Sequence, residues 1–278
     1  MTITSTGNAA PRAAGARPAG RYSAADLIRS EWVKLRTVRS TAWTLGMTAL
    51  VGLASSGIAT GVTRAHWATI SAASKAAFSP VEVPLMGALL GGTLLLGIFG
   101  ILVISSEYAT GTIRATLAAA PRRPLVLAAK VAVFGTVALA VAEAVTFASF
   151  LLGQAFLTAP AKSATLSSPG ALRAVAGTGL FLCTVGLLAL GIAVMVRHTA
   201  GAISAYVGVI LVLPIIVEAI PGTLQHQIER VLPLMIGETF VGNPGPDSFG
   251  PWTGLLIMCG YVGLALAVGT ALLVRRDA

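Results

Sequence analysis

The chain has 278 residues, of which 55% are hydrophobic and only 10% are charged, and its mean hydropathy is +0.85. A soluble domain carries about 25% charged residues, so this composition argues against a soluble enzyme and predicts an integral membrane protein. The net charge of +9 comes largely from basic residues beside apolar segments. That arrangement argues against a nucleic-acid partner, which would require a soluble basic patch.

The chain begins with a polar segment that precedes any apolar run. Residues 1–22 are rich in Ala, Gly and Pro and contain no apolar h-region, so we expect a disordered tail rather than a signal peptide. Residues 23–40 predict an amphipathic helix on the inner membrane surface. Ser23 and Asp26 have the spacing of an approximate capping box at its start.

The two faces of this interfacial helix differ in polarity. Trp32, Lys34 and Arg36 suit the headgroup level of a bilayer, where aromatic rings and cations are both favourable. Glu31 violates the pattern because it falls on the apolar side. The segment is interpreted either as a juxtamembrane anchor or as a conformational lever.

Residues 41–278 form one predicted transmembrane domain. A helix needs about 20 apolar residues to cross a bilayer core of about 30 Å, and continuous apolar runs exclude a barrel of alternating strands. The predicted fold is therefore all-α with six spans. The predicted spans are residues 41–62, 85–106, 131–157, 174–196, 199–220 and 252–274.

Basic residues predict the orientation. With both termini inside, 14 of the 19 Lys and Arg residues lie on the cytoplasmic side, as the positive-inside rule requires. We therefore expect a multi-pass protein of a bacterial plasma membrane with both termini in the cytoplasm. The high Ala, Gly and Arg content is typical of a GC-rich bacterial genome, such as those of actinobacteria.

Residues 221–251, between the fifth and sixth spans, are too apolar for a solvated loop. Pro233 and Gly237 interrupt them, so they are also too broken to span. We expect two short re-entrant helices that dip back from the outer face, a geometry tolerated where protein or a water-filled cavity shields the backbone.

The cytoplasmic loop at residues 107–124 carries defined start and stop signals. Thr110, Gly111 and Thr112 predict a turn and an N-cap for a short helix that Pro121 ends. Beyond it, we expect Arg122, Arg123 and Lys130 to hold the end of the loop at the membrane surface. A short, rigid inner helix of this kind would serve as a docking segment for another protein.

Enzyme chemistry has no support in the sequence, which lacks a phosphate-binding loop, a metalloprotease motif, a nucleophile elbow and metal-ligand spacing. One ionisable residue, Glu143, lies well inside a predicted span. A charged carboxylate there costs about 2.5–3.5 kcal/mol on insertion scales. It is interpreted either as a substrate or proton site or as a buried residue hydrogen-bonded to a neighbouring helix.

The segment "SSEYATGTIRATLAAAPRR" resembles the inner loop of the permease subunits of ABC exporters (ABC type-2), in which a Glu, a Gly-Thr pair, a basic residue and a Pro with basic residues follow one another. The segment "IRSEWVKLRTVRSTAWTL" is similar to their connecting helix, and residues 221–251 to their re-entrant helices. The loop at 63–84 departs from the pattern. These 278 residues contain no phosphate-binding loop, so we expect any ATPase to be a separate subunit.

The resemblance implies a pair of such subunits, identical or different, bound by two separate cytoplasmic ATPase subunits that hold the ATP and Mg. It implies a cargo path along spans two and five, and the apolar composition favours a hydrophobic or amphiphilic cargo. The implied coupling residues are Glu107, Tyr108, Gly111, Thr112, Arg114, Arg122 and Arg123. Two alternatives stay open: an ion-coupled carrier that uses Glu143, and a membrane anchor or regulator that transports nothing.

Overall fold

The computed structural model describes residues 23–113, 123–159, 161–242 and 248–276; the predicted disordered tail at 1–22 lies outside these ranges. No strand occurs within them, and six helices are long and apolar enough to cross a membrane. The six-span, all-helical prediction is confirmed at this level. The six are α2 (Arg39–Ala65), α4 (Glu82–Ala109), α6 (Arg123–Phe156), α7 (Ala171–Val196), the combined segment Thr199–Glu218, and α12 (Pro251–Arg276).

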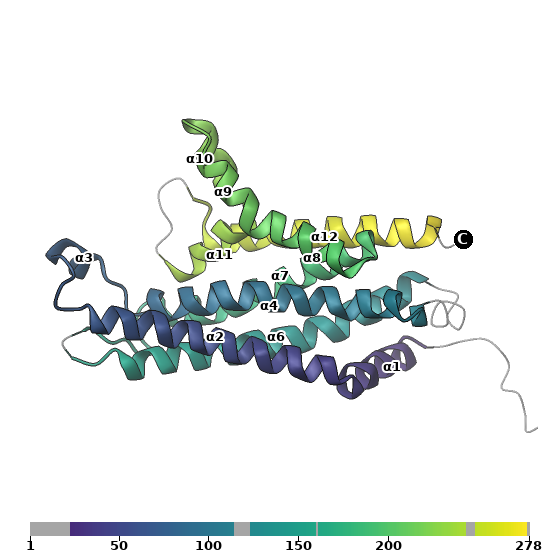
Figure 1. Cartoon of the computed structure of the whole chain (residues 1–278), viewed down its shortest axis with the longest axis horizontal. Helices are drawn as coiled ribbons and strands as arrows, with labels where there is room; N and C mark the ends of the chain where they lie inside the picture. The colour runs from purple at the N-terminus through teal and green to yellow at the C-terminus, as the bar shows by residue number, and fades with distance from the viewer. Residues whose placement is uncertain (1–22, 114–122, 160, 243–247, 277–278) are drawn as a thin grey trace, which may run out of the picture.

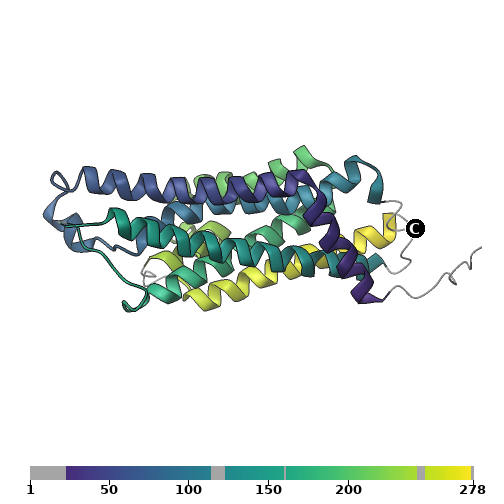
Figure 2. The same cartoon turned by 90° about the horizontal axis from the view of Figure 1, so that it is seen from below.

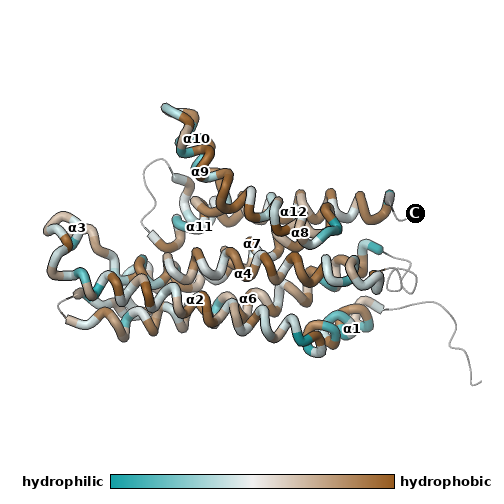
Figure 3. Tube along the Cα trace, viewed as in Figure 1, coloured by the Kyte–Doolittle hydropathy of each residue, from teal (hydrophilic) through white to brown (hydrophobic). Residues whose placement is uncertain are grey.

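The long helices lie side by side as an elongated bundle (Figure 1). Apolar residues dominate along their length, while hydrophilic stretches gather on the first short helix and near helix ends (Figure 3). The N-terminal helix and the end of α12 lie at the same end of the bundle (Figure 1), as an even number of spans requires. The short helix α3 (Ala72–Ala77) lies at the opposite end.

Helix α1 (Ala24–Thr37) lies crosswise to the bundle and packs chiefly on α6 (Figure 2). Its start confirms the predicted capping box: the Ser23 hydroxyl accepts from the Asp26 amide, and the Asp26 carboxylate accepts from Ser23. One extended residue, Val38, separates it from α2. The predicted interfacial helix therefore ends at Thr37 rather than at residue 40.

Helix α7 is the centre of the bundle and packs against α4, α6, α11 and α12. Glycines let it approach α4 closely: a Cβ at Gly100 would lie 2.3 Å from the Gly186 carbonyl oxygen. Gly97 leaves room in the same way for the ring of Tyr206, whose hydroxyl donates to the Thr93 carbonyl at 2.5 Å. The core thus depends on backbone-to-backbone approach that larger side chains would prevent.

The fifth span is interrupted in the middle. It consists of α8 (Thr199–Val207), a π-helical turn at Gly208–Val212, and α9 (Leu213–Glu218), with Pro214 in the first turn of α9. Proline cannot donate the backbone hydrogen bond of a regular helix, and π turns commonly accompany such breaks. Only α8 packs on α4 and α7; α9 and the following α10 (Thr223–Glu229) project away from the bundle (Figure 1).

Helix α11 (Pro233–Val241) packs against α7 and α12. Pro233 occupies its first turn, where the missing amide costs nothing. The expectation that Gly237 breaks this segment is wrong, because α11 continues through it. The glycine instead admits the ring of Phe181 from α7, which lies 2.5 Å from the position of a Cβ.

Candidate functional site

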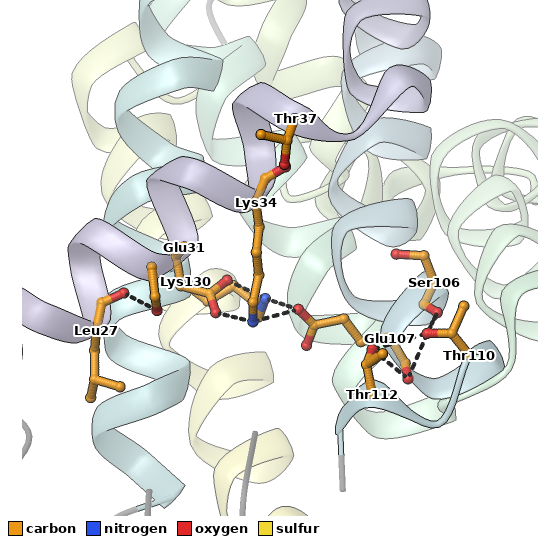
Figure 4. A network of polar contacts seen from close by, with 10 residues as sticks. Leu27, Glu31, Lys34, Thr37, Ser106, Glu107, Thr110, Thr112 and Lys130 are labelled. Atoms are coloured by element: carbon orange, nitrogen blue, oxygen red, sulfur yellow. Dashed lines mark hydrogen bonds and ion pairs between the residues drawn. The ribbon is translucent and has the colours of Figure 1, made fainter. Parts of the chain in front are cut away.

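Four charged side chains from three helices meet at the end of the bundle where α1 lies (Figure 4). Lys34 Nζ of α1 lies 2.6 Å from Glu31 Oε1 and 3.1 Å from Glu107 Oε1, which belongs to the last turn of α4. Lys130 Nζ of α6 lies 2.8 Å from Glu107 Oε1 and also pairs with Glu31 Oε2. These four residues are called the charge cluster below. Each carboxylate contacts both ammonium groups.

Three members of the charge cluster are buried. The side chains of Glu31, Lys130 and Glu107 are 5%, 4% and 11% exposed, whereas that of Lys34 is 38% exposed. Buried ions lose hydration, and their attraction offsets this loss only when the pairing is complete. The cluster is therefore a rigid connection between α1, α4 and α6 in which removing one charge leaves another without compensation.

The electrostatics of Lys34 follow from this geometry. Burial by itself lowers the pKa of Lys34, but the Glu31 hydrogen bond and the charges of both carboxylates outweigh it, so the pKa is raised overall. Glu107 stands in the last turn of α4, where the partial negative charge of a helix C-terminus disfavours a carboxylate. The positive charges of Lys34 and Lys130 offset this unfavourable interaction of the Glu107 carboxylate with the helix end.

The cluster explains why Glu31 lies on the apolar side of α1. That side faces the bundle, and the carboxylate meets Lys130 there. The expectation that Lys130 holds the loop to the membrane surface is wrong, because α6 begins at Arg123 and carries Lys130 into the interior. A lone acidic residue on an apolar stripe was the available signal that a buried cation had to exist, but it could not identify that cation.

The turn after α4 contains two predicted coupling residues. Gly111 has φ 71°, in the left-handed region that favours glycine. The hydroxyl of Thr110 donates to the Ser106 carbonyl and lies 2.9 Å from the Thr112 hydroxyl. This turn therefore has a defined backbone shape. The predicted coupling residues Arg114 and Arg122, with most of the predicted short helix, lie outside the described residues.

Tyr108, which follows Glu107, faces a second group of contacts. The Arg197 guanidinium lies 5.4 Å from the centre of the Tyr108 ring, within the range of a cation–π interaction. Arg197 also donates to the Leu272 carbonyl at 3.2 Å. Its backbone is left-handed, with φ 60° at the end of α7.

A second arginine binds the same end of α12. Arg123 Nη1 donates to the carbonyls of Leu273 and Val274 at 3.2 and 3.3 Å. The final carbonyls of a helix have no partner within the helix, and basic side chains stabilise them. Arg123 was predicted as a site residue, whereas Arg197 was missed because sequence spacing gives no indication of its distance from α12.

The other predicted interfacial residues remain at the surface of α1. Trp32 is exposed, and the Arg36 guanidinium lies 6.0 Å from the centre of its ring. Neither joins the charge cluster. They have the exposure that a headgroup contact requires.

Glu143 lies far from the charge cluster, in the middle of α6 and opposite Gly179 of α7. A Cβ at Gly179 would lie 2.6 Å from the Glu143 carboxylate, so the glycine provides the space for this side chain. Glu143 forms no ion pair within the described ranges, and the same ranges contain no cluster of three His, Cys, Asp or Glu side chains suited to a metal.

A cavity of about 350 Å³ opens beside the charge cluster, between α1, α2 and α4. Its walls include Leu35, Phe99, Leu102 and Val103, and its polar end is formed by the cluster itself. The site therefore combines a rigid set of ion pairs with adjacent free volume.

The described residues form a helical protein in which six helices are long and apolar enough to cross a membrane. Comparison with protein-family models finds no match, and comparison with curated proteins finds none either.

Proposed function

We propose that the chain is the membrane subunit of an ATP-driven exporter of the ABC type-2 kind. In this proposal both termini are cytoplasmic, α1 is the interfacial helix, and α11, which packs on α7 and α12, is an outer re-entrant helix. A separate ATPase subunit binds the loop after α4 and supplies ATP and Mg. A second permease subunit completes the transporter, and the cargo is hydrophobic or amphiphilic.

The observation that carries the proposal is the pair of connections made by consecutive residues at the end of α4. Glu107 joins α1 and α6 through the charge cluster. Tyr108 faces Arg197, which also holds the end of α12. A displacement of the loop would therefore reach four helices through rigid polar contacts. A solvated connector would not require such contacts at its base.

The proposed cycle follows from this connection. Closure of the ATPase subunits would push on residues 107–113 and rotate α4 with α1 as one body. Helix α9 has few contacts with the bundle, so the outer half of the fifth span can move relative to α4. The cycle is then a population shift between inward- and outward-facing states.

The test compares two glycines whose φ angles are similar and positive. Gly111 and Gly170 have φ 71° and 79°, and Gly170 is left-handed with ψ −10°. An added Cβ would have no atom within 4 Å at Gly111, and only the flexible end of Arg173 at 3.7 Å at Gly170. Alanine in the left-handed region costs about 1–2 kcal/mol of local strain. Gly111→Ala alters the proposed coupling turn, and Gly170→Ala is the control at the opposite end of the bundle, directly before α7.

Where an ABC ATPase is encoded beside this chain, the two are purified together and reconstituted in liposomes. ATPase binding, ATP hydrolysis and cargo flux are then measured. We expect Gly111→Ala to reduce binding or to uncouple hydrolysis from flux, while Gly170→Ala retains binding and coupling. Equal behaviour of the two variants would remove the coupling role of the loop. Binding without flux in the wild type would favour the non-transporting anchor.

An ion-coupled carrier is the second candidate, because Glu143 is an intramembrane carboxylate without an ion pair in the described part of the chain. A proton-coupled carrier would lose transport in Glu143→Gln and would require a proton gradient rather than ATP. An exporter driven by ATP would retain ATP-dependent flux in that variant.

A further inference from the structure

The cavity beside the charge cluster has one apolar side and one polar end. It has a volume of about 350 Å³, at the low end of the roughly 300–1,000 Å³ typical of small-molecule sites. The apolar side is formed by Leu35 and Val38 near α1, and by Phe99, Leu102 and Val103 of α4. This side suits a short hydrocarbon chain.

The polar end contains hydrogen-bond donors and an acceptor whose capacity is not fully used. Each lysine ammonium has three N–H donors, and Lys34 and Lys130 each contact two carboxylate oxygens. The Glu107 side chain is 11% exposed, and its Oε2 is buried without a hydrogen-bond partner. A buried acceptor in this state has lost its hydration without compensation. A hydroxyl group in the cavity could accept from Lys34, whose side chain is 38% exposed. It could donate to Glu107 Oε2 once the carboxylate rotates to bring that buried oxygen to the cavity wall.

The charge of the cluster limits the ligand further. Two lysines and two glutamates give a net charge of zero at the polar end. A charged headgroup would add an uncompensated ion to a partly buried site, which is unfavourable. A neutral head that both donates and accepts a hydrogen bond leaves the balance unchanged.

We propose that this cavity binds a small neutral amphiphile, with its hydroxyl or amide head between Glu107 and Lys34 and its hydrocarbon chain against Leu102 and Phe99. The site goes beyond the proposed transport function and does not depend on it. Because α1 and α4 form two of its walls, an occupant would hold these helices at one separation.

The test uses the full chain in phosphatidylcholine nanodiscs and a decan-1-ol probe that carries a diazirine in its chain. Light-dependent labelling is mapped by mass spectrometry. We expect saturable labelling of residues 31–44 and 99–112 that excess decan-1-ol suppresses. Decyl sulfate and decyltrimethylammonium should compete at least about tenfold less well, because their heads are charged.

Two variants fill the cavity without changing a charge. Leu102→Trp adds bulk to the α4 wall, and Thr44→Phe adds bulk to the α2 wall. Leu90→Trp is the matched control, because Leu90 is an exposed residue of the same helix that does not line the cavity. Folding of each is checked by size-exclusion chromatography.

We expect either folded filling variant to abolish saturable labelling and the control to retain it. Non-saturable labelling, equal competition by the charged compounds, or unchanged labelling in a folded filling variant would each overturn the proposal. The labelling assay does not measure ATPase binding, so a negative labelling result would not contradict the transport proposal.

Discussion

Replacing Lys130 by Met should strongly destabilise the protein while preserving the length of the side chain. Lys130 is buried and contacts both Glu31 and Glu107. Breaking a buried ion pair from one side costs about 3–5 kcal/mol, because the remaining charge has no compensation. Lys34 still contacts both carboxylates, so we expect a loss of about 3 kcal/mol in the free energy of unfolding, the lower end of that range.

The free energy of unfolding is measured by SDS titration in mixed micelles, followed by circular dichroism. Lys162→Met is the control, since Lys162 is exposed and surface changes are usually within about 0.5 kcal/mol. The double variant Glu31→Gln/Lys130→Met should lose less than the sum of its two single variants, by about 0.5–3 kcal/mol. The reasoning fails if Lys130→Met matches the control or if the two changes add.

Three further outcomes follow from the same structure. Hydrogen bonds from the Ser23 side chain and backbone lower the pKa of Asp26. The stabilisation of α1 by the Asp26 carboxylate is therefore present above pH 3.8 and is lost as pH falls through the pKa of the folded protein. Asp26→Asn should abolish this acid-induced loss of helix stability in a circular dichroism titration. Burial, with a neighbouring carboxylate, raises the pKa of Glu238. Its contribution to the free energy of unfolding is therefore favourable below pH 4.5, where it is protonated, and is lost as pH rises through the pKa of the folded protein. Glu238→Gln should raise the melting temperature at neutral pH, and an unchanged melting temperature would contradict this. Gly100→Ala places a Cβ 2.3 Å from the Gly186 carbonyl and should cost about 1–3 kcal/mol, whereas Gly260→Ala, with nothing within 4 Å, should be neutral or stabilising.

The charge cluster holds α1 to the bundle by contacts that binding to a membrane surface alone would not require. A helix held only by its apolar face could slide along the membrane surface. Glu31 and Lys34 instead hold α1 to α4 and α6 at defined positions. The conformational-lever interpretation of this helix stays a proposal, and the glycine comparison above tests whether the adjoining loop drives it.

Much of the architecture could be predicted from local sequence. Each predicted span lies on a helix because a membrane-spanning segment must satisfy its backbone hydrogen bonds internally, so apolar run length alone indicates it. The capping box of Ser23 and Asp26 was equally predictable, since its partners are three residues apart. The ends of the helices were harder to predict from the sequence. Helix α6 begins at Arg123 rather than at residue 131, because a proline such as Pro124 fits the first turn of a helix.

The sequence by itself determined the number of long apolar helices, the capped start of α1 and the anomaly at Glu31. Only the tertiary structure decided which cation meets Glu31, since Lys130 lies 99 residues away and its positive charge had predicted a position at the membrane surface. It likewise decided that Arg197 reaches α12 from 75 residues away. The physical reason is that helix formation depends on neighbours within one or two turns, whereas a buried charge is paired by the packing of whole helices.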